Sequence, residues 1–95
     1  MNKYELVVII DAQKAQGEKE EIYKQIVDIV NKAGAKVINA QVWLEKQKFF
    51  FTIKKKHEGT YYLVNFEGAT SFLVKIKELL RLNENILRYL IIKNV

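Results

Sequence analysis

The chain has no cysteine and no proline, and its 95 residues include one histidine and four isolated glycines. Without cysteine, neither a disulfide framework nor a thiolate site can form. The glycines make no phosphate-binding loop. No apolar run approaches the roughly 20 residues that a membrane helix needs, and residues 1–5 do not resemble a signal peptide. We therefore expect a cytoplasmic protein with no membrane partner.

Residues that could carry out chemistry are few and scattered. His57 has no companion ligands and sits in a lysine-rich turn, which favours a solvated side chain over a metal ligand. Glu18, Glu20 and Glu21 are typical of the first turn of a helix, where the dipole favours anions. Ser71 has no histidine partner by motif. The sequence predicts no catalytic residue, no metal, no cofactor and no small-molecule substrate, and therefore no enzyme.

The charge balance favours a polyanionic partner. Sixteen lysines and arginines against eleven acidic residues give a net charge of +5 and a pI near 9.4. Such an excess attracts polyanions but does not identify them. Only Arg81 and Arg88 are arginines, and lysine meets phosphate as a point charge rather than reading base edges. The composition indicates contact with a nucleic-acid backbone more than sequence reading.

Hydrophobic periodicity predicts four strands and two helices. Ile22, Ile26 and Ile29 recur at helical spacing after Glu18, and Gly34 can supply the left-handed cap that ends this helix. Thr70 or Ser71 can cap the second helix. A turn over 55–59 should join one long second strand to the third. The predicted strands are 4–10, 36–54, 61–66 and 86–93.

The order β-α-β-β-α-β predicts one α+β domain over residues 1–95. Two βα units around a hairpin form a ferredoxin-like split βαβ sandwich, a four-stranded antiparallel sheet with both helices on one face. First and last strands are neighbours in this topology. Val7, Ile9, Leu90 and Ile92 should then form an uncovered apolar patch, and such patches often mark interaction surfaces. A bent strand or a terminus could cover it instead.

Aromatic and basic clusters leave two interpretations open. Lys54, Lys55 and Lys56 could neutralise phosphates at a hairpin tip, or could keep that tip soluble and discourage edge pairing. The aromatics of 49–51 and 61–62 could stack on bases, but their spacing fails the RNA-recognition-motif signature, and cross-strand core pairs explain them more simply. Trp43 is expected to face a partner or to pack rather than to stack on a base.

Residues 82–93, LNENILRYLIIK, resemble the closing segment of the bacterial small-subunit ribosomal protein S6 family. The opening pair Tyr4 and Glu5, the glycine and alanine at 34–35, and the stretch 58–67 match in the same order. Departures lie in 43–52, where the family often has a Trp-Gly-Lys-Arg run and a proline, and at Asn2, where an arginine is common.

The resemblance implies a structural constituent of the small ribosomal subunit. It implies binding to the central domain of small-subunit ribosomal RNA together with ribosomal protein S18. The RNA contacts carried over by position are Lys3, Tyr4, Arg88 and Lys93, to which we add the basic hairpin tip. The apolar patch and Trp43 become the partner surface. The alternative is a ferredoxin-like regulatory or dimerising domain that binds a small molecule, since fold does not fix function.

Overall fold

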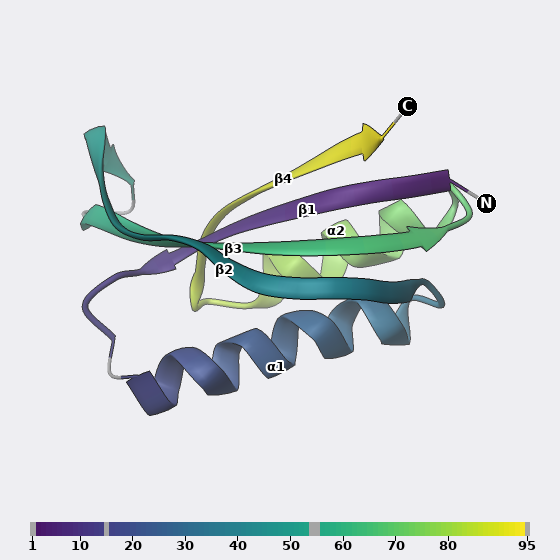
Figure 1. Ribbon diagram of the computed structural model, residues 1–95, viewed down its shortest axis with the longest axis horizontal. Helices are drawn as coiled ribbons and strands as arrows, with labels where there is room; N and C mark the ends of the chain where they lie inside the picture. Colours follow the sequence, from purple (N-terminus) through teal and green to yellow (C-terminus); the bar gives the residue numbers. More distant parts are fainter. Residues whose placement is uncertain (1, 15, 54–55, 95) are drawn as a thin grey trace.

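The computed structural model describes residues 2–14, 16–53 and 56–94, with side chains except at 16, 45–53, 56 and 57. Figure 1 shows a four-stranded sheet in the order β2-β3-β1-β4, with both helices on one face. The predicted fold class is confirmed. The elements are β1 (Asn2–Asp11), α1 (Gln16–Lys32), β2 (Lys36–Ile53), β3 (Lys56–Gly68), α2 (Phe72–Leu82) and β4 (Ile86–Asn94).

Strand β1 lies in the middle of the sheet and fixes its register. It pairs antiparallel with both β3 and β4, so that Val7 lies opposite Leu63 on one side and Leu90 on the other. Directly opposed residues share a face of a sheet. The predicted neighbourhood of the first and last strands is therefore confirmed, as is the single long second strand paired with the third.

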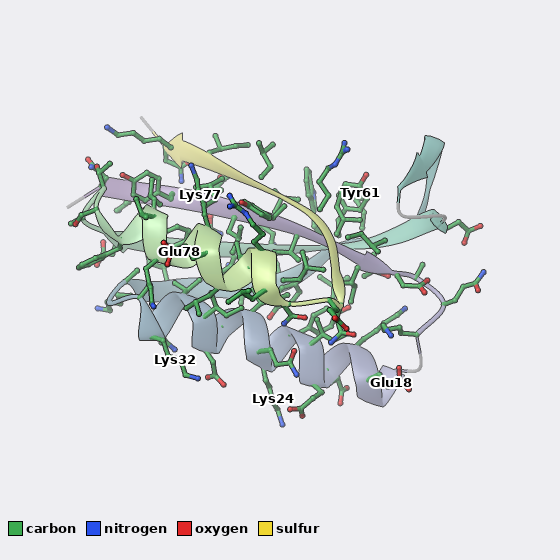
Figure 2. The ribbon with its side chains drawn as sticks, turned by 180° about the vertical axis from the view of Figure 1, so that it is seen from behind. Glu18, Lys24, Lys32, Tyr61, Lys77 and Glu78 are labelled. Carbon is green, nitrogen blue, oxygen red and sulfur yellow. The ribbon has the colours of Figure 1, made fainter. Side chains whose placement is uncertain are left out.

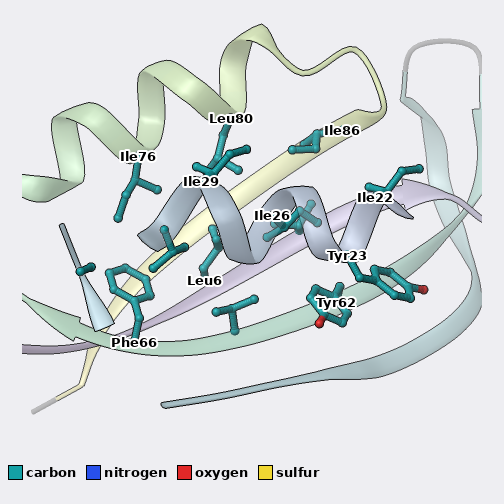
Figure 3. Packing of buried hydrophobic residues seen from close by; sticks show 14 of the residues in the cluster. Leu6, Ile22, Tyr23, Ile26, Ile29, Tyr62, Phe66, Ile76, Leu80 and Ile86 are labelled. Atoms are coloured by element: carbon teal, nitrogen blue, oxygen red, sulfur yellow. The ribbon is translucent and has the colours of Figure 1, made fainter. Parts of the chain in front are cut away.

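The core fills the space between the sheet and the helices. In Figure 3, Ile22, Ile26 and Ile29 project from α1 and Ile76 and Leu80 from α2 toward the strands. The even-numbered residues of β1 supply the opposing side. Because side chains alternate across a strand, the odd-numbered residues of β1 face away from the helices. The face that they form is called the open face below.

The end of α1 shows why a glycine stands there. Gly34 has a φ of 98°, in the left-handed region that glycine enters without strain. Its N–H donates to the carbonyl of Asn31 at 3.0 Å, and the Ala35 N–H donates to that of Val30 at 3.3 Å. These two bonds define a Schellman motif. The predicted glycine cap is confirmed.

Two local expectations were wrong. Strand β3 already begins at Lys56, so that the turn is shorter than 55–59. Ser71 makes no side-chain capping bond to α2. The Thr70 hydroxyl is instead 3.0 Å from the Tyr4 hydroxyl. First-turn N–H groups at 72 and 73 bond to backbone carbonyls of the preceding turn.

Candidate functional site

A hollow of about 440 Å³ opens on the open face of the sheet, and we call it the open-face hollow. All five residues predicted as partner contacts line it, so the structure brings them together on one surface. Strands β1, β3 and β4 form it, with one residue from β2. Its lining residues are Glu5, Val7, Ile9, Trp43, Tyr61, Leu63, Arg88, Tyr89, Leu90 and Ile92.

The exposed apolar surface of the hollow is at its rim rather than at its floor. Val7 and Ile9 are each only 9% exposed, whereas Leu90 is 58%, Trp43 52% and Ile92 43% exposed. The expectation that all four aliphatic residues would be uncovered is therefore wrong for the two on β1. They lie on a central strand, and neighbouring side chains of β3 and β4 cover them from both sides. The edge strand β4 has a neighbour on one side only.

Strand β2 is irregular where Trp43 reaches this surface. Val42 pairs with Tyr62, yet Leu44 pairs with the adjacent Tyr61, so Trp43 is an extra residue in the strand. A bulge of this kind re-aims a side chain. The Trp43 ring lies edge-on to that of Tyr61, with centroids 6.2 Å apart and planes at 73°. Together the two rings form the wall of the hollow on the side away from β4.

Neighbouring tyrosines on β3 have different roles. Tyr62 stacks on Tyr23 of α1 with centroids 4.1 Å apart, and burial raises the pKa of Tyr62. Figure 2 shows Tyr61 on the side of the sheet away from α1. Of the two neighbouring tyrosines, Tyr62 is therefore a core ring and Tyr61 a surface ring. The aromatic side chains of 49–51 lie outside the described residues.

Two charged residues stand among the apolar lining, one toward each end of the hollow. Glu5 lies opposite Asn65 and Ile92, and Arg88 lies opposite Ile9. At about 3.3 Å per residue, the four-residue step from Glu5 to Ile9 spans about 13 Å. Neither charge is in an ion pair with another residue that the structure describes. The hollow thus has an acidic end and a basic end.

Tyr4 is a correction to the predicted RNA contacts. It is 3% exposed and stacks on Phe66 in the core, with centroids 5.4 Å apart. Its hydroxyl contacts that of Thr70 at 3.0 Å. Since both the ring and its polar tip are engaged inside the protein, Tyr4 has no free face for a base or a sugar.

The remaining predicted cations are exposed but dispersed. Lys3 and Lys93 lie near one end of the β1–β4 pair on opposite faces of the sheet, and Arg88 lies toward the other end of β4. The step from Lys3 to Ile9, which faces Arg88, is about 20 Å along β1. Lys54 and Lys55 lie outside the described residues, as does the side chain of Lys56, so the basic hairpin tip stays a prediction.

The hollow also contains residues that sequence reasoning missed: Glu5, Tyr61, Leu63 and Tyr89. Glu5, Tyr61 and Leu63 could have been found from strand alternation. Each precedes a core residue (Leu6, Tyr62 and Val64), so each should face the open side of the sheet. Tyr89 borders the hollow although it alternates with the open-face residues Arg88 and Leu90 of β4, and the sequence pattern therefore does not indicate it.

The described part of the chain shows neither a group of three or more potential metal ligands nor a helix of sufficient length and apolarity to cross a bilayer. The site is thus a shaped apolar surface with charges at its ends. Its geometry suits docking of another molecule by shape and hydrophobic contact.

Comparisons with known proteins agree on one family. Residues 3–93 match the model of a family described as ribosomal protein S6. The chain is 38% identical over 93 residues to small ribosomal subunit protein bS6 of Micrococcus luteus, covering 98% of this chain and 91% of that protein. It is 30% identical to bS6 of Fusobacterium nucleatum subsp. nucleatum, covering 98% of each.

A solved structure supports the fold. The crystal structure of 30S ribosomal protein S6 from Thermotoga maritima superposes with a TM-score of 0.88 at 22% identity, covering 98% of this chain and 87% of that one. At that level of identity the likeness bears on the fold alone.

Proposed function

Since this chain belongs to the ribosomal protein S6 family and is a structural component of the small ribosomal subunit, we propose that it binds the central domain of small-subunit ribosomal RNA together with ribosomal protein S18. The curated relatives are small-subunit proteins, so the prediction of a non-enzymatic protein is confirmed. The same relationship removes the support for a small-molecule regulatory domain.

The open-face hollow is the proposed site for S18. Leu90, Ile92 and Trp43 leave about half of their side-chain surface open in the free chain. Burying such surface against a partner is favourable by roughly 25 cal/mol per Å². Val7 and Ile9 are already packed in the free chain, so they give that partner a preformed apolar surface to dock against. The clustering of all five predicted partner residues around one hollow is the observation that carries this part of the proposal.

The proposed RNA contacts are the exposed cations Lys3, Arg88 and Lys93, with the basic hairpin tip at 54–56 as a further prediction. Each would neutralise a phosphate and release counterions. Their dispersal over about 20 Å suits contact with several backbone segments of a folded RNA, rather than a single phosphate cluster. Such contacts position an RNA without reading its sequence.

Filter binding of a central-domain RNA fragment to the chain mixed with purified S18 tests the proposal. We expect the logarithm of the affinity to fall linearly with the logarithm of the salt concentration. The double variant Lys3→Gln/Lys93→Gln should weaken binding and reduce the slope by roughly one per lost contact.

A matched control is available on the opposite layer. Figure 2 shows Lys24 and Lys32 projecting from α1 away from the sheet. Lys24→Gln/Lys32→Gln removes the same charge and should leave the slope unchanged. Equal effects of the two double variants would mean that net charge alone attracts the RNA, and would contradict the proposed contacts at Lys3 and Lys93.

A further inference from the structure

We infer that Glu5 selects the partner segment that docks in the open-face hollow by accepting a lysine or arginine side chain from it. The inference rests on the proposed function, which places S18 in this hollow, and it specifies the chemistry of the segment that enters. The docked segment would present a large apolar side chain to the rim and a cation beside it.

Glu5 is the only carboxylate among the described residues that line the hollow. Its cross-strand neighbours on the open face are Asn65 on β3 and Ile92 on β4, both neutral. It is partly buried, and no described cation forms an ion pair with it. A carboxylate that loses more water when a partner docks needs a compensating charge or donors. Lys3, the lysine on the same face of β1, lies directly opposite Glu67 rather than Glu5.

The next row of the same face shows the contrast. Glu67 lies opposite Lys3 on one side and Lys36 on the other. That anion therefore has cations of its own chain across both strand pairs, where opposite charges attract. The Lys36–Glu67–Lys3 row thus has two cations for its one anion. Glu5, one row further into the hollow, has no cation directly opposite it.

The same charge argues for protein rather than RNA at Glu5 itself, whereas the proposed RNA contact Lys3 lies in the next row, opposite Glu67. A phosphate brought against Glu5 would meet a like charge in a partly desolvated setting, which is unfavourable. A lysine or arginine would meet its complement there. Arg88 stands about 13 Å away along the sheet, so the hollow has an anion toward one end and a cation toward the other. A docked segment with complementary charges therefore has one favourable direction.

The test is calorimetric titration of purified S18 into the full chain and two variants. Glu5→Gln keeps the shape and removes the charge, and should weaken binding about fivefold; Glu5→Lys presents a like charge and should weaken it about 20-fold or more. The loss for Glu5→Gln should shrink at high salt. Glu78→Gln on α2 (Figure 2) is the control, since it makes the same charge change on the other layer and should leave binding unchanged.

Binding to RNA separates the two kinds of occupant. If RNA rather than protein approached this end, Glu5→Lys would strengthen RNA binding and leave S18 binding unchanged, which overturns the inference. S18 binding that responds to Leu90→Ala but not to either Glu5 variant overturns the inference alone. No binding of S18 to the unchanged chain overturns the proposed function as well. Thermal unfolding of each variant identifies any loss that comes from misfolding.

Discussion

Replacing Leu90 by alanine should weaken S18 binding without unfolding the protein. Leu90 is 58% exposed at the rim of the open-face hollow. Full burial of a leucine side chain is favourable by about 1.5–3 kcal/mol, so burial of the exposed share contributes roughly 1–1.7 kcal/mol. Alanine keeps part of that surface. The expected loss is about 1 kcal/mol, or about fivefold in Kd.

The measurement is calorimetric titration with S18, paired with thermal unfolding of the free variant. The side chain is mostly exposed in the free chain, so the free energy of unfolding should change by less than about 1 kcal/mol. Leu82→Ala is the control, because Leu82 is 77% exposed at the end of α2 on the other layer. The reasoning is refuted if Leu90→Ala binds S18 as the unchanged chain does, or if Leu82→Ala weakens binding equally.

Two further predictions concern the scaffold. Gly68→Ala should lower the free energy of unfolding by about 1–3 kcal/mol, because its Cβ would lie 2.8 Å from Phe72 Cδ2. A Cβ added at Gly17 in α1 would meet no atom within 4 Å, so Gly17→Ala should raise the free energy of unfolding by up to about 1 kcal/mol. Both are measured by denaturant unfolding, and changes of the same sign in the two variants would contradict this packing. Tyr62 has a raised pKa, so the unfolded chain ionises first above about pH 10. Stability should therefore fall as pH rises beyond that value, and less steeply in Tyr62→Phe; parallel pH curves of thermal unfolding for the two proteins would exclude Tyr62 as the cause.

The fold followed from local patterns because each was strong. The helical spacing of Ile22, Ile26 and Ile29 and the glycine at 34 specified α1, and strand order then followed from the β-α-β-β-α-β topology. The bulge at Trp43 could not be predicted, because it depends on how β2 pairs with Tyr61 and Tyr62 across the sheet. Sequence spacing within one strand carries no such information.

The site was predicted unevenly for the same reason. Alternation placed Val7, Ile9, Leu90 and Ile92 on one face correctly, but it could not tell a covered floor from an exposed rim. That difference comes from strand position, which is central for β1 and at the edge for β4. Tyr4 is a different kind of miss. Its parity with the core residues of β1 already indicated a buried ring, and the role implied by family resemblance conflicted with that pattern.

Strand β1 couples the two surfaces of this protein through its alternation. Its even-numbered side chains fill the core beneath the helices, and its odd-numbered ones form the floor and the acidic end of the hollow. A change at Val7 or Ile9 therefore disturbs packing as well as docking, since each is already 9% exposed before any partner arrives. Strand β4 has its exposed rim residues on an edge, where little packing depends on them. Binding energy and folding energy can thus be separated experimentally in β4 and at Glu5, but not along the floor.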